Sequence, residues 1–108
     1  MANPEWQEAI EQFSQSVKDK LSTKVKDVRL FGSVVKGTDT AESDIDILVL
    51  VENDDRKIVD IIMDVTVDIN LDYDVVISPI IMTDSYYSNP LFRETGFFQA
   101  LAQEGVSI

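Results

Sequence analysis

At 108 residues with 44% hydrophobic side chains, the chain can bury one continuous core, and we expect a single domain over residues 1–108. The absence of cysteine and histidine excludes disulfides, thiolate chemistry and imidazole chemistry, so any reaction must use carboxylates, hydroxyls, backbone dipoles, lysine, arginine or hard cations. A net charge of -11 argues against nucleic acid as a partner but permits a nucleotide carried with a divalent cation.

The first expected element is a helix from Asn3 to Leu21. Asn3 is its expected N-cap and Pro4 its first helical residue. Its apolar residues recur at helical spacing at Trp6, Ile10, Phe13, Val17 and Leu21. A short strand from Val25 to Phe31 follows, and it ends at Gly32.

The second half of the chain begins with a strongly apolar segment, Ile45 to Val51, which we expect to be a central strand. After a loop and cap over residues 52–55, a helix is expected from the spacing of Ile58, Ile61, Ile62, Val65 and Ile69. A third strand is expected over roughly Asp74 to Met82, and Thr83 begins a cap for a short helical turn. A last helix is expected after Pro90, with apolar residues at Leu91, Phe92, Phe97, Phe98, Leu101 and Ala102.

This alternation of strands and helices predicts an α/β layer fold with three or four strands. The chain shows neither the basic start of a signal peptide nor an apolar run of roughly 18 to 20 residues. We therefore expect a cytoplasmic protein without a membrane partner.

A candidate phosphate site lies where the first strand runs into Gly32 and Ser33. Glycine permits close backbone approach, and a helix start offers unpaired N–H groups to phosphate oxygens, with the Ser33 hydroxyl as an added donor. Lys36 adds a cation nearby. Taken alone, such a Gly-Ser pair also fits an ordinary turn.

A candidate metal site lies at the start of the apolar strand, where Asp44 and Asp46 are two residues apart. Side chains at that spacing share one strand face, and two adjacent carboxylates are costly unless a cation neutralises them. Oxygen ligands of this kind suit Mg²⁺. Alone, the pair could equally be solvated charges at a strand end.

Together, Gly32 and Ser33, ten intervening residues, and Ser43-Asp44-Ile45-Asp46 resemble the signature of the DNA polymerase beta superfamily of nucleotidyltransferases. The chain is similar in particular to the small members called minimal nucleotidyltransferases. This resemblance implies the polymerase beta-like fold, a small mixed sheet of three to four strands flanked by helices. Competing motifs fit less well: the phosphate-binding P-loop fails at Thr38, and an EF-hand fails at Val49.

The resemblance also implies roles for single residues. Gly32 and Ser33 would hold the phosphates of a nucleoside triphosphate, ATP being the expected substrate, and Asp44 and Asp46 would bind Mg²⁺. Members usually carry a third carboxylate on a neighbouring strand; Asp74 is the first candidate and Asp72 the second, and either could instead cap the end of the preceding helix. The family often has arginine shortly after Gly-Ser, where this chain has Lys36, a point charge rather than a two-pronged donor.

Two functions are consistent with these features. The first is transfer of AMP from ATP to an acceptor hydroxyl, which the resemblance extends to a tyrosine of a small helical HEPN-type toxin, with this chain as antitoxin. The second is a catalytically weak or inactive binding protein that neutralises a partner by contact alone, or a homodimer that covers its apolar last helix. Adenylylation of a small drug-like molecule ranks last, because no extension for binding such a molecule is recognisable.

Overall fold

The computed structural model describes residues 4–31, 45–96, 98, 99, 103 and 105–108. Its elements in chain order are α1 (Pro4–Leu21), a 3-10 turn η1 (Ser22–Lys24), β1 (Val25–Phe31), β2 (Ile45–Val51), α3 (Arg56–Tyr73), β3 (Ile77–Thr83), α4 (Asp84–Tyr87), α5 (Pro90–Arg93) and β4 (Val106–Ser107). The expected bounds of α1, β1 and β2 are confirmed, except that Asn3, the expected cap of α1, lies outside the described residues.

The four strands form one mixed sheet in the order β3-β2-β1-β4. Strand β1 is antiparallel to both β2 and β4, whereas β2 and β3 are parallel. The edge position of β3 explains how it accommodates Pro79, since proline cannot donate a ladder hydrogen bond. The predicted α/β fold with a small mixed sheet of three to four strands is therefore confirmed.

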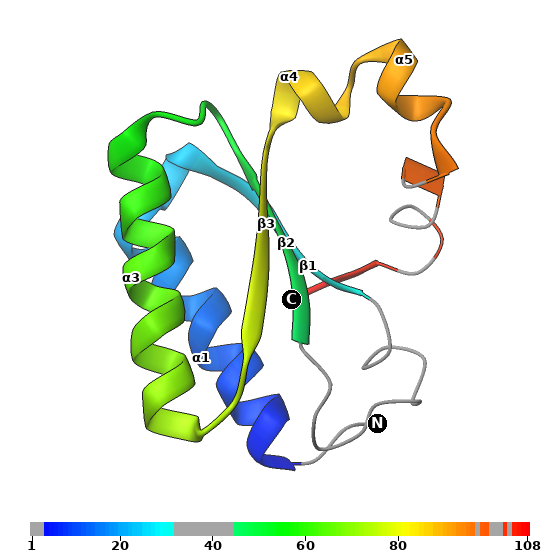
Figure 1. Ribbon diagram of the computed structural model, residues 1–108. Coiled ribbons are helices and arrows are strands. Elements are labelled where there is room, and N and C mark those ends of the chain that lie inside the picture. Colours follow the sequence, from blue (N-terminus) through cyan, green and yellow to red (C-terminus); the bar gives the residue numbers. More distant parts are fainter. Residues whose placement is uncertain (1–3, 32–44, 97, 100–102, 104) are drawn as a thin grey trace.

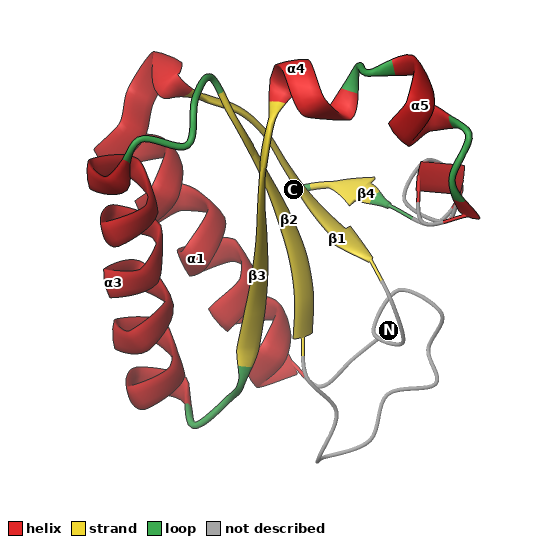
Figure 2. Cartoon of the chain, turned by 45° about the horizontal axis from the view of Figure 1, so that its top comes forward, coloured by secondary structure: helices red, strands yellow, loops and turns green. Residues whose placement is uncertain are grey.

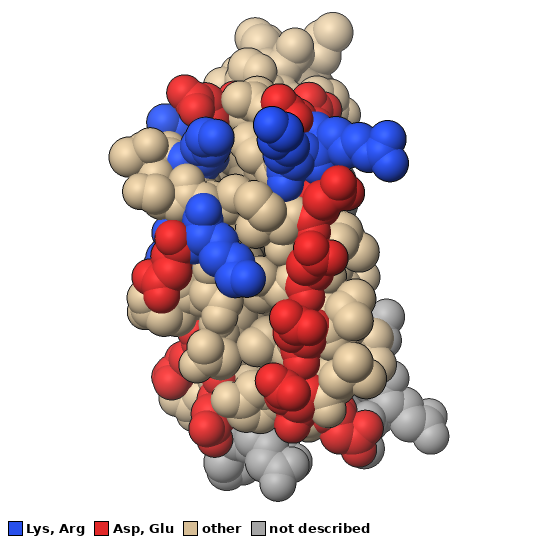
Figure 3. Space-filling view, turned by 90° about the vertical axis from the view of Figure 1, so that its left-hand side faces the viewer, with Lys and Arg blue, Asp and Glu red and all other residues tan. Residues whose placement is uncertain are grey.

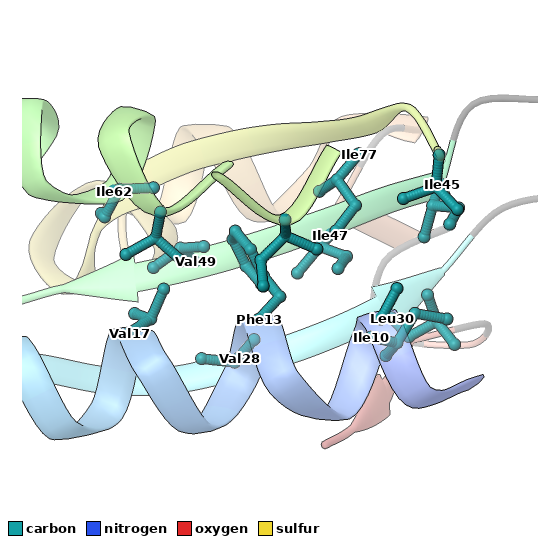
Figure 4. Packing of buried hydrophobic residues seen from close by; sticks show 14 of the residues in the cluster. Ile10, Phe13, Val17, Val28, Leu30, Ile45, Ile47, Val49, Ile62 and Ile77 are labelled. Atoms are coloured by element: carbon teal, nitrogen blue, oxygen red, sulfur yellow. The ribbon is translucent and has the colours of Figure 1, made fainter. Parts of the chain in front are cut away.

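Helices α1 and α3 lie side by side on one face of the sheet (Figure 1). The main core fills the space between them and the strands, as Figure 4 shows in close view. Phe13 of α1 and Ile62 of α3 are fully buried there. The strands contribute alternate residues to this core: Val28 and Leu30 from β1, Ile45, Ile47, Val49 and Val51 from β2, and Ile77 from β3.

The opposite face of the sheet, called the second face below, carries a smaller apolar cluster under α4 and α5 (Figure 2). Its buried members are Leu48, Leu50, Met82 and Phe92. The side chains of Thr83 and Asn89 cap the two short helices by accepting hydrogen bonds from Tyr86 N and Leu91 N at 3.1 and 2.9 Å. The cap expected from the sequence at Thr83 is confirmed, and Asn89 caps the second short helix in the same way.

The sequence prediction differs from the structure in the third strand and the last helix, and it does not include β4. The third strand begins at Ile77 rather than near Asp74, because α3 runs on to Tyr73. The single helix expected after Pro90 is interrupted: α5 ends at Arg93, and the Thr95 hydroxyl accepts a hydrogen bond from Phe98 N at 3.1 Å, as a residue that starts a new helical turn does. Phe97, Leu101 and Ala102 lie outside the described residues.

Candidate functional site

Asp46 lies on the second face, near the start of β2. Its neighbours Ile45 and Ile47 are fully buried in the main core beneath α1 and α3. Because side chains alternate along a strand, Asp46 points to the opposite side, where it is half-buried. The next residue on that side, Leu48, belongs to the smaller apolar cluster. The Asp46 carboxylate therefore lies at one end of the apolar cluster on the second face.

The pairing of the strands determines what lies beside Asp46. Its Cα partner in β1 is Phe31, and its partner in β3 is Ser78. Phe31 is the last residue of β1, so the chain leaves this strand and enters β2 at the same end of the sheet (Figure 2). The segment between these two points carries the other candidate residues, Gly32, Ser33, Lys36 and Asp44, which lie outside the described residues.

Asp74 occupies the end of α3 instead of a strand. It adopts a left-handed conformation, with φ 53° and ψ 50°, and its N–H donates to the carbonyl of Asn70. The Asn70 side chain then accepts a hydrogen bond from Ile77 N at 2.8 Å, which sets the start of β3. The expectation of a carboxylate on a strand at Asp74 or Asp72 is therefore wrong, because Asp72 is helical. The alternative that the sequence left open is confirmed for Asp74, which caps the end of α3.

Asp74 nevertheless belongs to the same end of the sheet as Asp46. Strand β3 is parallel to β2, and the carbonyl of Val76 accepts a hydrogen bond from Ile45 N at 2.8 Å. The residue directly beside Asp46 on β3 is the half-buried Ser78, which the sequence analysis did not single out. In the sequence, Ser78 could have been noticed as a polar residue within an apolar segment. Only the strand register shows that it lies beside Asp46.

Among the described residues, no three acidic side chains come together closely enough to hold a metal ion. The carboxylate oxygen of Asp46 is a donor suited to Mg²⁺, and its half-buried position limits competition from water. A second ligand from the adjoining segment is needed to complete such a site. A carboxylate is the chemical type of ligand that Mg²⁺ takes, so Asp46 fits such an ion, whereas Asp44 lies outside the described residues.

The second face also carries a cation that the sequence analysis missed. Arg29 of β1 lies beside Leu48, and its Nε donates to Asp27 Oδ2 at 2.7 Å. The hydrogen bond with Asp27 raises the pKa of Arg29 above its ordinary value, and partial burial opposes this rise. Ser107 of β4 donates to the same carboxylate at 3.3 Å. The Asp27 carboxylate thus links β1 to β4 and holds the Arg29 side chain in place.

A nucleotidyltransferase domain model matches residues 10–94, which include β1, β2, α3 and β3. The chain belongs to the nucleotidyltransferase domain family. It is of the minimal type that the sequence resembles, and membership of this family makes it a transferase of nucleotidyl groups by class.

The chain is also similar to a protein of Methanocaldococcus jannaschii, provisionally named protein adenylyltransferase MJ0604. The two are 31% identical over 99 residues, which make up 92% of this chain and 93% of the relative. A solved structure described as a toxin-antitoxin with AMP-PNP shares the fold at 20% identity, with a TM-score of 0.56 over 90% of this chain and 70% of that one. Within the part of this nucleotidyltransferase that the structure describes, no helix is long and apolar enough to cross a membrane.

Proposed function

We propose that this nucleotidyltransferase transfers AMP from ATP to an acceptor hydroxyl, with Mg²⁺ bound by Asp44 and Asp46. The observation that carries the proposal is the pairing of Phe31 with Asp46. It brings the strand that leads into Gly32 next to the strand that carries Asp46, the second member of the acidic pair. These strands lead to the two halves of the family's signature, which can form one site only if the strands are neighbours.

The proposed roles follow from the chemistry of each residue. The backbone N–H groups at Gly32 and Ser33, with the Ser33 hydroxyl, donate to the terminal phosphate oxygens, and Lys36 adds a positive charge. Asp44 and Asp46 hold the cation, which when bound neutralises phosphate charge and lowers the barrier to attack at the α-phosphorus. Ser78, next to Asp46, is placed to orient that carboxylate or a water on it.

The reaction forms one bond and breaks one. The oxygen of the acceptor hydroxyl bonds to the α-phosphorus, and the bond from that phosphorus to the bridging oxygen breaks, so that pyrophosphate leaves with the electron pair. The hydroxyl proton passes to a carboxylate of the site. Asp74 is the proposed third carboxylate, since it lies at the same end of the sheet and is exposed.

The proposed acceptor is a tyrosine hydroxyl of a small helical HEPN-type partner, with this chain acting as its antitoxin. Two relatives support this choice: the archaeal one is named for transfer of adenylyl groups to protein, and the solved neighbour is described as a toxin-antitoxin complex with an ATP analogue. In this proposal the partner supplies the acceptor-binding surface.

The test is incubation with α-labelled ATP, Mg²⁺ and the protein encoded beside this one. We expect label on a tyrosine of the partner, and its loss in Asp44→Asn with Asp46→Asn. Asp54→Asn is the matched control, because Asp54 is exposed and follows the other end of β2. Transfer that is unchanged in the double variant would contradict the proposal.

A second candidate function is neutralisation of the partner by contact alone, which is favoured because the described residues bring no three acidic side chains together. As a helix cap, Asp74 has a structural role that needs no catalysis. A growth assay distinguishes the two functions: if the double variant at Asp44 and Asp46 still neutralises a toxic partner, contact suffices, and if neutralisation is lost while the complex still forms, transfer is required.

A further inference from the structure

Helix α3 repeats an apolar residue followed by aspartate at every fourth position. The pairs are Val59 and Asp60, Met63 and Asp64, Val67 and Asp68, and Leu71 and Asp72. All four aspartates are exposed. So are the last three apolar members, with exposed fractions of 43% for Met63, 51% for Val67 and 77% for Leu71. The repeat is visible in the sequence, but only burial shows that it lies outside the core.

Residues four apart on a helix lie one above the other, so the repeat forms two adjacent rows along α3. The buried residues of α3, which face the core, are different ones: Ile58, Ile62, Val65, Thr66 and Ile69. Figure 3 shows acidic side chains in a continuous column on the side of the molecule where α1 and α3 lie, with basic side chains gathered at one end. We call the two rows the α3 outer face: Met63, Val67 and Leu71 with Asp60, Asp64, Asp68 and Asp72.

The charges of this face oppose the stability of the isolated chain. Like charges at four-residue spacing repel one another along a helix. The ends are also reversed, since Arg56 and Lys57 lie at the start of α3 and Asp72 in its last turn, against the helix dipole. Arg56 lies 3.9 Å from Asp60, but no lysine or arginine of the described chain forms an ion pair with Asp64, Asp68 or Asp72. A helix that carries both unfavourable charge and exposed apolar surface is typical of a binding face.

We propose that the α3 outer face binds a partner protein whose own surface carries an apolar row flanked by lysine or arginine. Charge complementarity determines this choice of occupant. A second copy of the chain would set aspartates against aspartates, and nucleic acids or acidic lipids would be repelled in the same way. A basic amphipathic helix matches both rows, covers the apolar side chains and neutralises the charges.

Apart from its last turn, which adjoins the proposed third carboxylate at Asp74, this face is separate from the proposed nucleotide site. Helix α3 packs on one face of the sheet, whereas Asp46 points to the second face. A helix bound along α3 would not cover the ends of β1 and β2 near Asp46. The inference therefore does not depend on the proposed function, and its failure would leave that function untouched.

The test is the binding of a fluorescent synthetic helical peptide with a leucine row flanked by arginines, measured by anisotropy on the full chain. A matched peptide carries glutamates in place of the arginines. We expect the arginine peptide to bind, the glutamate peptide not to bind, and added salt to weaken binding. Combining Asp64→Asn with Asp68→Asn should weaken binding about tenfold, since two exposed charge pairs are lost.

Two further variants distinguish the contribution of the apolar row from a general effect of negative charge. Val67→Ser together with Leu71→Ser should also weaken binding, whereas Glu8→Gln with Glu11→Gln, on the exposed side of α1, should leave it unchanged. Circular dichroism and thermal unfolding confirm that each variant is folded. Equal binding of the two peptides, no binding of either, or equal weakening by the α1 variants overturns the proposal. A dimer in sedimentation equilibrium that Val67→Ser dissociates also overturns it, because a second copy would then be the occupant.

Discussion

Asp74 combines an unusual backbone conformation with a candidate role at the site. Left-handed φ and ψ angles are readily adopted by glycine and less readily by other residues. Replacement by glycine removes this strain and leaves the hydrogen bond from its N–H to Asn70 in place. The single residue therefore permits structure and chemistry to be tested separately.

We predict that Asp74→Gly raises the free energy of unfolding by up to about 1 kcal/mol. Asp72→Gly is the matched control, because Asp72 is inside α3, where glycine costs roughly 0.3 kcal/mol relative to aspartate and loss of the repulsion from Asp68 offsets this, so we expect no gain in stability. Urea unfolding measures both. If Asp74 is the third carboxylate, Asp74→Gly loses transfer while it gains stability; a loss of stability would contradict the assigned conformation.

Asn70 connects the end of α3 to the start of β3 through its bond to Ile77 N. Asn70→Ala leaves that N–H without its acceptor next to a buried side chain, and should lower the free energy of unfolding by about 1 to 3 kcal/mol. Asn70→Asp keeps an acceptor oxygen for Ile77 N and should therefore lower the free energy of unfolding by less than Asn70→Ala does. Equal losses in chemical unfolding would show that the hydrogen bond contributes little.

Some of these residue-scale features could be predicted from the sequence, and others could not. The caps at Asp55, Thr83 and Asn89 involve bonds to residues only two or three positions ahead, so the local sequence suffices. At Asp74 the local sequence permitted a strand as well as a helix end. The difference depends on whether α3 continues past its β-branched residues, and packing against the core decides that.

Helix α3 provides the clearest prediction at the scale of an element. Asp64→Lys changes two repulsive pairs, with Asp60 and Asp68, into attractive ones, and should stabilise the chain by about 0.5 to 1 kcal/mol at low salt. The gain should shrink as salt screens the charges. Thermal unfolding at two ionic strengths measures it. Glu52→Lys, at an exposed position outside the helices, tests for a general effect of lowering the negative charge, and an equal gain there would contradict the role of the row.

Elements with a strong local pattern were predicted well. Helix α1 and strands β1 and β2 have regular apolar spacing, and their expected bounds agree with the structure. Strand β4 was missed because its two residues carry no pattern of their own and depend on pairing with Arg29 and Leu30 of β1. The interruption after α5 was missed because the apolar spacing continued past Thr95, whose hydroxyl starts a new turn.

At the scale of the whole molecule, the sheet makes neighbours of β1, β2 and β3, which are separated in the sequence. The motif spacing suggested a site, but it could not show that β1 and β2 are antiparallel neighbours or that β3 runs parallel beside them. Those pairings arise from long-range packing of Phe13, Ile47 and Ile62 in one core. The two sides of that sheet then separate Asp46 from the α3 outer face, so the proposed transfer site and the proposed binding face lie on different sides of the molecule.

The most direct test of the central claim compares ATP labelled at the α-phosphate with ATP labelled at the γ-phosphate. With Mg²⁺ and the partner protein present, adenylyl transfer predicts protein labelling from the α-label alone, and no labelling by Asp46→Asn. Labelling from the γ-phosphate would indicate a kinase-like reaction and contradict the account. So would the absence of labelling from either position with a partner that the chain demonstrably binds.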